Sequence, residues 1–419
     1  MPARFATLGE WLAWQQTLSP RTIELGLERV IFVAERLGLQ KPACPVITVA
    51  GTNGKGSVVA MLESILTAAG YRTGTYTSPH LLAYNERIRI AGHAVEDAPL
   101  MEAFAAIDEA RADRALTYFE FGTLAALYIF RQASVDALVL EVGLGGRLDA
   151  VNCVDPDVAV ITSIDIDHSE WLGNDREAVG FEKAGIMRTG RVAVCGDYSP
   201  PGSVVRHAAA IGADLRCIGR DFFSERKINT FIWSQGGRRI ELPKPSLAGD
   251  HQTDNASTAL AALTALETHL PVHESTLAAG LRSVELPGRY QRLSTSPSII
   301  LDVAHNPQAA HALAATLQAQ PFPGKTLAVF SALEDKDIHA MLAPMRKVVD
   351  QWFIGGLGAH RGLKAEALAE RLEIAGIKAS KYKRVIHAVK AAREHARPDD
   401  RIIVFGSFLT VAEAMESGL

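Results

Sequence analysis

The sequence of 419 residues is poor in cysteine and has no excess of positive charge. Its four cysteines, Cys44, Cys153, Cys195 and Cys217, are far apart in the sequence and form no C-x-x-C pair. This spacing argues against a disulfide framework or a zinc site, and it indicates reduced thiols in the core of a cytosolic protein. The formal net charge of -4 supplies no overall positive field, so we expect no binding to nucleic acid or to an anionic membrane.

Long apolar runs are also missing. A membrane helix needs about 20 consecutive apolar residues, and the apolar runs at 124–130 and 402–405 are far shorter. The first residues, 1–6, are not followed by the apolar core of a signal peptide, so we expect a cytoplasmic protein. Neither a fixed-period repeat nor a low-complexity tract interrupts the chain. A chain of this length then predicts two or three globular domains, and nothing in it calls for more than a monomer.

Short, β-branched apolar runs alternate with amphipathic helical patterns. This alternation predicts a doubly wound, mostly parallel α/β sheet whose strands are buried on both faces. The expected strands of the first domain are 46–50, 137–142, 158–164 and 191–195, and those of the second are 299–303, 326–330, 351–354 and 401–405. The breaker-rich segment between them predicts a linker. We therefore expect an N-terminal domain at 1–285, a linker at 286–297 and a smaller C-terminal α/β domain at 298–419.

A glycine-rich segment, 51–57, directly follows the first expected strand and leads into a helix. Glycines allow backbone N–H groups to turn toward an anion, and a helix N-terminus adds partial positive charge. Lys55 would reach the β- and γ-phosphates of a nucleotide. The standard P-loop pattern is not met, because Gly56 stands where a hydroxyl residue should follow the lysine and Ser57 comes one residue later. The alternative is a glycine-rich turn with an incidental lysine.

Acidic residues and a histidine end two further strands. Glu141 closes a buried strand, where a carboxylate is costly unless a cation compensates it, and magnesium prefers such oxygen ligands. An ion pair between Glu141 and Arg147 is the alternative. Asp165, Asp167 and His168 crowd the end of the next strand, where they could equally cap the helix that follows. Ligands of open α/β sheets bind at the carboxyl ends of strands, so these loops are candidate site elements.

Taken together, the motifs resemble the folylpolyglutamate synthase and dihydrofolate synthase family, part of the Mur ligase superfamily. The resemblance covers almost the whole chain, and the order and number of its motifs make it specific. The matching segments are 25–30, 51–57, 77–81, 118–123, 141–152, 161–168, 182–186, 286–289, 302–307 and 406–408. The extra glycine of the phosphate loop is a feature of this family. Two departures are Leu409, where the family often has histidine, and the segment 195–201.

The resemblance implies a ligase that uses ATP and two magnesium ions, with a monovalent cation such as potassium as an addition. The residues implied to bind ATP are Thr52, Asn53, Gly54, Lys55, Gly56, Ser57, Asn255, Arg289 and Asp302. The implied magnesium ligands are Ser57, Ser78, Glu141 and His168. Lys183 matches a lysine that the family carries as a carbamate (N6-carboxylysine), which turns a cation into an anion. The implied catalytic residues are Lys55, His168, Lys183 and His305.

The same resemblance implies the small-molecule substrates dihydropteroate, reduced folates and L-glutamate. The residues implied to bind the pterin are Thr22, Ile23, Glu24, Leu25, Thr117, Tyr118, Phe119, Glu120, Leu148, Asp149 and Ala150. His305 and Ser407 are implied to bind glutamate in a C-terminal domain that closes on the first. For the stretches 22–25 and 117–120, a helix cap and a buried aromatic pair are the alternative interpretation.

The implied reaction joins L-glutamate to dihydropteroate, giving dihydrofolate, and to the γ-carboxyl group of reduced folates, giving folylpolyglutamates. Both steps would pass through an acyl phosphate. The stretches 22–25 and 117–120 favour an enzyme with both activities over a folylpolyglutamate synthase alone. The remaining alternatives are a ligase of peptidoglycan precursors and a nucleotide-binding module without catalysis.

Overall fold

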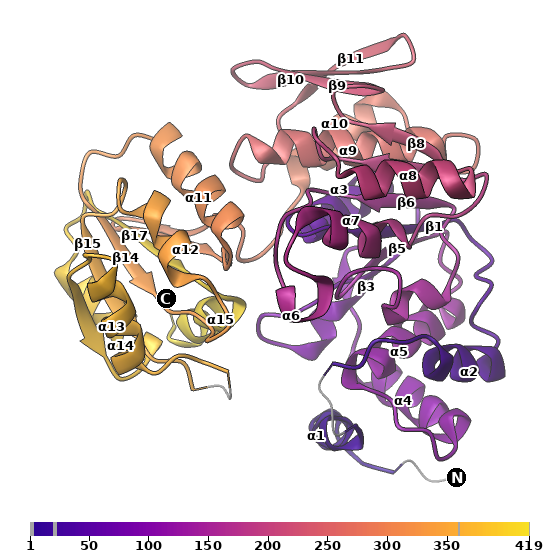
Figure 1. Ribbon diagram of the computed structural model, residues 1–419, viewed down its shortest axis with the longest axis horizontal. Coiled ribbons are helices and arrows are strands. Elements are labelled where there is room, and N and C mark those ends of the chain that lie inside the picture. Colours follow the sequence, from indigo (N-terminus) through magenta and orange to yellow (C-terminus); the bar gives the residue numbers. More distant parts are fainter. Residues whose placement is uncertain (1–3, 20–22, 359–360, 419) are drawn as a thin grey trace. The chain divides into compact units, whose positions relative to one another are not determined.

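The computed structural model describes residues 4–19, 23–358 and 361–418. These residues form two compact units (Figure 1). The first contains the chain up to residue 246 together with 252–284, and the second contains 247–251 and the chain from 285 onward. Each unit is built around a mostly parallel sheet, as the alternation of apolar runs and helical patterns predicted. In the described part of the chain, no helix combines the length and the apolarity needed to cross a bilayer.

The first unit contains an eight-stranded sheet with the order β4-β3-β2-β5-β1-β6-β7-β8. Neighbouring strands from β2 to β8 run parallel, whereas β3 and β4 extend the β2 edge with antiparallel pairing. Its strands are β1 (Val46–Ala50), β2 (Thr73–Tyr76), β3 (Ile88–Ile90), β4 (His93–Ala94), β5 (Ala137–Glu141), β6 (Val158–Ile161), β7 (Val192–Cys195) and β8 (Asp214–Cys217). Every residue of β1 and β5 is buried, which explains their unbroken apolar character.

Helices cover both faces of this sheet (Figure 1). On one face, α5, α7 and α8 share a hydrophobic core with alternate residues of β1, β5, β6 and β7. On the other face, α3 follows β1 and packs against α10. The helices of the unit are α1 (Leu8–Leu18), α2 (Glu28–Leu37), α3 (Lys55–Ala68), α4 (Asp97–Arg111), α5 (Tyr118–Gln132), α6 (Ser169–Leu172), α7 (Arg176–Ala184), α8 (Gly202–Ile211), α9 (His251–Ala265) and α10 (Glu274–Ser283), with 3₁₀ turns at Tyr84–Arg87 and Ala150–Cys153.

A separate antiparallel sheet of three strands, in the order β11-β10-β9, completes the first unit. Its strands are β9 (Phe222–Arg226), β10 (Thr230–Gln235) and β11 (Arg238–Pro243). The indole of Trp233 in β10 is buried and donates a hydrogen bond to the carbonyl of Ser257 in α9, at 3.2 Å. This bond attaches the small sheet to α9.

The second unit has a six-stranded sheet with the order β12-β13-β17-β14-β15-β16. The strands are parallel except at the β12 edge. They are β12 (Gln291–Thr295), β13 (Ser298–Asp302), β14 (Thr326–Phe330), β15 (Gln351–Gly355), β16 (Ala379–Tyr382) and β17 (Arg401–Phe405). The helices are α11 (Pro307–Ala319), α12 (Ile338–Met345), α13 (Ala365–Ile374), α14 (Val385–His395) and α15 (Phe408–Glu416). Strand β12 lies within the segment 286–297, which the breakers in the sequence had suggested as a linker.

The eight strands expected from apolar runs are all present, with ends that differ by at most a few residues. Strands β2, β8 and β16 were not predicted, because their short and partly polar segments carry no unbroken apolar run. Cys195 and Cys217, far apart in the sequence, are register partners on the neighbouring strands β7 and β8, and all four cysteines are free thiols.

Candidate active site

The carboxyl ends of β1, β5 and β6 meet at one edge of the first sheet, because these strands are parallel neighbours. Val49 lies opposite Glu141, and Ala50 lies opposite Ile161. The glycine-rich loop, Glu141 and the segment that begins at Thr162 are therefore brought to the same edge. This is the place where open α/β sheets bind ligands.

The glycine-rich loop, residues 51–54, joins β1 to α3, which begins at Lys55. Gly51 and Gly54 have φ angles of 149° and 90°, which favour glycine. A Cβ atom on Gly51 would lie 1.7 Å from the hydroxyl oxygen of Thr162, so this position has no room for a side chain. A Cβ atom on Gly54 would lie 2.6 Å from Oδ1 of Asn255. Asn255 of α9, predicted to bind ATP, thus lies directly against the loop.

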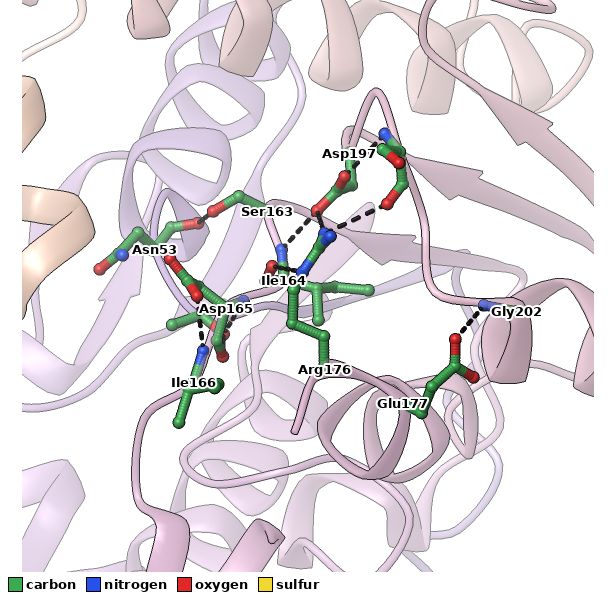
Figure 2. Close-up of polar contacts among 11 residues, drawn as sticks. Asn53, Ser163, Ile164, Asp165, Ile166, Arg176, Glu177, Asp197 and Gly202 are labelled. Carbon is green, nitrogen blue, oxygen red and sulfur yellow. Dashed lines mark hydrogen bonds and ion pairs between the residues drawn. The ribbon is translucent and has the colours of Figure 1, made fainter. Parts of the chain in front are cut away.

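The loop is fixed to the segment after β6, as Figure 2 shows in part. The hydroxyls of Thr162 and Ser163 donate hydrogen bonds to the carbonyl of Asn53, at 2.7 and 3.2 Å. The hydroxyl of Thr52 donates to the carbonyl of Asp165 at 2.8 Å and accepts the N–H of the same residue at 3.0 Å. The N–H of Thr52 donates to the carbonyl of Ser163 at 2.7 Å. These bonds direct the polar groups of Thr52 toward the neighbouring segment.

Lys55 stands at the start of α3, where a helix leaves its first N–H groups without intrahelical acceptors. Its ammonium donates hydrogen bonds to the carbonyls of Gly51 and Thr52, at 3.1 and 3.2 Å. The side chain is therefore folded back over the loop. Ser57, two residues further on, is buried in the first turn of α3.

Glu141, at the end of β5, is buried, with 5% of its surface exposed. Its carboxylate accepts the backbone N–H of Ser78 at 3.1 Å, which brings together two of the predicted magnesium ligands. Arg147, the alternative partner of Glu141, pairs with Glu182 at 2.8 Å. A buried carboxylate beside a glycine-lined loop is a donor that suits Mg²⁺.

Among the residues that the structure describes, no group of three or more His, Cys, Asp or Glu side chains is placed to hold a metal by itself. Mg²⁺ commonly takes only one or two protein ligands and completes its octahedron with phosphate oxygens and water. The donors at this edge therefore fit a magnesium ion that arrives with a nucleotide.

Lys183, in the last turn of α7, is buried with only 3% of its surface exposed. The pKa of its ammonium is lowered to about 7, chiefly by burial and also by the charge of Lys55. The carboxylates of Asp167 and Asp149 act in the opposite direction. One predicted catalytic lysine thus helps to lower the pKa of the other, buried one.

The segment that carries His168 leaves β6 and enters the short helix α6. His168 is the N-cap residue of α6, with φ 52°, and its side chain makes no capping hydrogen bond. Asp167 accepts the N–H of His168 at 2.8 Å, and Asp165 accepts the N–H of Ile166 at 2.8 Å. The two aspartates thus fix the turn that precedes α6. This agrees in part with the alternative that they cap the helix.

The predicted pterin residues come together around Arg29 of α2. Its guanidinium donates one hydrogen bond to the Glu24 carboxylate, at 2.9 Å, and forms an ion pair with the buried Glu120 at 3.0 Å. The N–H of Gly26 donates to the carbonyl of Leu148 at 3.3 Å. These contacts join three stretches that are far apart in the sequence. Ile23 and Leu25 are half-buried in the first of them, and Thr22 lies outside the described residues.

The start of α5 supplies both a cap and aromatic rings. Thr117 is the N-cap, and it forms a capping box with Glu120. The rings of Phe119 and Tyr76 lie 5.7 Å apart, and those of Tyr118 and Tyr84 lie 5.5 Å apart. The helix-cap alternative for this stretch therefore describes its structure, and the rings of Tyr118 and Phe119 are partly buried.

Asp149 has a structural role in the loop after β5. Its carboxylate accepts the backbone N–H groups of Leu144 and Val151, at 2.8 and 3.1 Å. Burial raises the pKa of this carboxyl to about 7. Ala150, the next residue, is buried and begins the 3₁₀ turn.

In the second unit, the predicted residues gather around Phe408 at the start of α15. The guanidinium of Arg289 lies 5.0 Å from the centre of the Phe408 ring, and the His305 ring lies 6.0 Å from it. Burial raises the pKa of Asp302, and the nearby charge of Arg289 opposes this effect. Ser407 is the buried N-cap of α15 and accepts the N–H of Thr410 at 3.0 Å.

Sequence reasoning missed four residues that organise this edge: Arg29, Thr162, Arg176 and Asp197. Arg29 and Thr162 lie within matched family segments and Asp197 within the segment 195–201, but no role was predicted for any of the four, because each acts in part through partners that are distant in the sequence. A charged residue at the end of a buried strand, as Asp197 is after β7, was the only signal that could have singled one of them out.

The fold and the site together define a nucleotide-phosphate-binding α/β protein of the P-loop type. The model of the Mur ligase middle domain matches residues 49–263, and the model of the Mur ligase glutamate ligase domain matches residues 288–408. The dihydrofolate synthase/folylpolyglutamate synthase of Escherichia coli strain K12 is 46% identical over 99% of this chain and 96% of its own length. The folylpolyglutamate synthase of Lacticaseibacillus casei is 33% identical over 96% of each.

Solved structures agree with these relatives. Escherichia coli FolC in complex with DHPP and ADP is 46% identical and superposes with a TM-score of 0.94, over 99% of this chain and 98% of that one. A bifunctional folylpolyglutamate synthase/dihydrofolate synthase with Mn, AMPPNP and L-glutamate bound is 46% identical, with a TM-score of 0.92 over 99% of both chains. This chain belongs to the dihydrofolate synthase/folylpolyglutamate synthase family of Mur ligases.

The close approach of Gly51 to Thr162 predicts a large effect of a single methyl group. Gly51→Ala should lower the free energy of unfolding by about 3–5 kcal/mol, because it adds a collision to the strain of a positive φ. Gly70→Ala is the matched control, since Gly70 also has a positive φ, of 88°, but has no atom within 4 Å of an added Cβ. That control should cost only about 1–2 kcal/mol. Chemical denaturation of the two variants measures the difference, and equal losses would contradict it.

Proposed function

We propose that this protein is an ATP-dependent ligase that joins L-glutamate to dihydropteroate and to the γ-carboxyl group of reduced folates. The observation that carries the proposal is the edge of the first sheet. There a glycine-lined loop with Lys55 lies beside the buried residues Glu141 and Lys183, in a chain of the dihydrofolate synthase/folylpolyglutamate synthase family. These are groups that bind and neutralise a nucleotide triphosphate.

The chemistry requires activation of an acid. A carboxylate is a poor electrophile, and its oxygen leaves with difficulty. Transfer of the γ-phosphoryl group from ATP to the carboxylate forms an acyl phosphate and releases ADP. The amine of glutamate then attacks the carbonyl carbon, and inorganic phosphate leaves as the amide forms.

The residues of the phosphate loop have electrostatic and positioning roles in this reaction. We propose that Thr52, Asn53, Gly54, Gly56 and Ser57 surround the phosphates, while Lys55 leaves the loop carbonyls and pairs with the transferring group. Asn255, directly against Gly54, supports the nucleotide from α9. In the second unit, Arg289 and Asp302 contact the nucleotide, and His305 and Ser407 contribute to glutamate binding.

Two magnesium ions complete the proposed site, with a monovalent cation such as K⁺ as an addition. When bound, magnesium withdraws charge from the phosphate oxygens. Ser57, Ser78, Glu141 and His168 would hold the ions. Lys183, converted to a carbamate, would add negative charge beside Lys55. The ammonium form of Lys183 would instead repel the ammonium of Lys55.

Two activities, not one, are favoured by the arrangement around Arg29. It joins the stretches that carry Glu24 and Glu120, and the bond from Gly26 to Leu148 adds the third stretch of the predicted pterin site. The partly exposed rings of Tyr118 and Phe119 at the start of α5 are groups against which we propose that the flat pterin stacks. A folylpolyglutamate synthase alone, as the Lacticaseibacillus casei relative is named, is the second candidate.

We further propose that the protein acts as a cytoplasmic monomer on small molecules. Its four cysteines are free thiols in the structure, which suits a reducing compartment. We propose small anionic substrates and products, and no nucleic acid or membrane as a partner.

Lys55→Ala should leave a folded protein with about 100- to 1,000-fold lower turnover, because a preorganised charge on the transferring group is lost. ATP-dependent formation of the glutamate amide, with each acceptor, measures the effect. Lys41→Ala, which removes an exposed lysine, is the control and should retain full activity. Near-normal turnover of Lys55→Ala would contradict the role of the loop.

The acceptor assay separates the candidate functions. Incubation with ATP, glutamate and either dihydropteroate or a reduced folate should give product with both acceptors, detected by mass spectrometry. Product from reduced folate alone would leave only the polyglutamylating activity. Turnover of a UDP-linked acceptor would indicate a peptidoglycan-precursor ligase, and ATP that is bound but never split would indicate a binding module.

Carbamate formation on Lys183 should follow its lowered pKa. Only a neutral amine reacts with carbon dioxide, and with a pKa of about 7 the neutral fraction rises from about one tenth at pH 6 to about nine tenths at pH 8. With ¹³C-bicarbonate, a carbamate signal in the NMR spectrum should therefore grow across this range. Lys183→Arg should lack the signal. A signal that persists in this variant would show that another amine is modified.

A further inference from the structure

The segment after β6 is held from two sides. On one side, Ser163 and Asp165 form the hydrogen bonds to Asn53 and Thr52 of the phosphate loop. Ile164 lies between these two residues, and its backbone N–H and carbonyl are bonded to residues other than those of the phosphate loop. Both of its backbone polar groups are engaged by residues that the phosphate-transfer chemistry does not include.

These residues are Arg176 and Asp197, shown in Figure 2. Nε of Arg176 donates a hydrogen bond to the carbonyl of Ile164 at 2.9 Å, and Nη2 donates to Oδ2 of Asp197 at 2.8 Å. The same Asp197 oxygen accepts the N–H of Ile164 at 2.9 Å. The three groups thus form a closed hydrogen-bonded arrangement in which the guanidinium and the carboxylate bind one peptide residue at both of its polar atoms.

Each member is also fixed to a different element. Asp197 follows β7, and its second oxygen accepts the N–H of Ser199 at 2.9 Å. Arg176 also donates to the carbonyl of Ser199, at 3.2 Å. Asp197 is nearly buried, with 10% of its side chain exposed, whereas Arg176 is 40% exposed. The pair therefore connects the ends of β6 and β7 at the edge of the sheet where the phosphate loop lies.

Arg176 is in addition the first residue of α7, the helix whose last turn carries Lys183. At that far end, the backbone N–H of Arg147 donates to the carbonyl of Glu182 at 2.8 Å, and Asn152 donates to the carbonyl of Gly185 at 3.1 Å. The helix is thus attached at both ends to loops of the site. Loss of the Arg176 side chain would remove the bond between the start of this helix and the carbonyl of Ile164.

We propose that Arg176 and Asp197 are positioning residues for phosphoryl transfer, which hold the 163–168 segment against the phosphate loop and set the start of α7. They touch no reacting atom. Their effect passes through Ile164 to Ser163 and Asp165, and from there to Thr52 and Asn53. This inference rests on the proposed function, because it concerns the nucleotide end of that site.

The test uses Arg176→Ala, Asp197→Asn and the conservative Arg176→Lys in the full chain. Arg206→Ala is the matched control, because Arg206 also pairs with a carboxylate of α7, Glu177 at 3.0 Å, but is 73% exposed and does not touch the 163–168 segment. Binding of AMPPNP with Mn²⁺ is measured by calorimetry. Steady-state assays give kcat and the KM for glutamate, and thermal unfolding shows that each variant is folded at the assay temperature.

We expect Arg176→Ala and Asp197→Asn to weaken AMPPNP binding and to lower kcat, each by about 10- to 100-fold, the usual effect of losing a group that orients a binding residue. The KM for glutamate should stay unchanged. Arg176→Lys should recover part of the loss, since an ammonium can reach one of the three acceptors but lacks the planar fork. Arg206→Ala should match the wild type in every measurement.

A folded Arg176→Ala with wild-type AMPPNP binding and kcat would overturn the inference. So would an equal loss in Arg206→Ala, because it would show that any loosening of α7 and α8 has the same effect. A general loss that raises the KM for glutamate to the same extent would also overturn it. Wild-type protein that binds AMPPNP but makes no amide would overturn the proposed function and leave the binding comparison decisive. Wild-type protein that binds no AMPPNP would overturn both.

Discussion

A phosphate-binding loop has to be rigid while its N–H groups at the helix start face the ligand, and this constraint decides how the loop of this protein is held. The carbonyl of Asn53 and the N–H and hydroxyl groups of Thr52 are hydrogen-bonded to the segment after β6. The first N–H groups of α3 are not needed for this purpose. The segment after the neighbouring strand thereby becomes part of the proposed nucleotide site, although it supplies no recognisable phosphate-binding motif.

Burial is the dominant electrostatic effect at this edge. It raises the pKa of Asp149 and lowers that of Lys183, so that both lie at about 7. Burying an acid and an amine costs free energy of folding. Buried groups with strongly shifted pKa values are common at functional sites, which is consistent with a role for both residues there. The proposed carbamate gives Lys183 a negative charge beside Lys55. Two cations that repel each other are thereby replaced by an anion and a cation that attract each other.

Several residues serve the fold and the proposed site at once. Glu120 completes the capping box of α5 and also pairs with Arg29. Ser407 caps α15 beside the ring of Phe408, which lies near Arg289 and His305. Such double use explains why a structural interpretation and a functional one could both be drawn from the same stretch of sequence. The capping contacts orient the helix start, and the helix start orients the groups that a ligand would meet.

The sequence by itself determined the α/β class, the buried strands, the glycine-rich loop and the family, because apolar runs, helix periods and motif order are local or linear properties. Only the tertiary structure decided which loops lie together, since that follows from the strand order β2-β5-β1-β6-β7-β8. It also placed Arg29 between Glu24 and Glu120, and Arg176 beside Asp197. Contacts of this kind join residues through space, and a single sequence records no spacing or periodicity from which such pairings could be read.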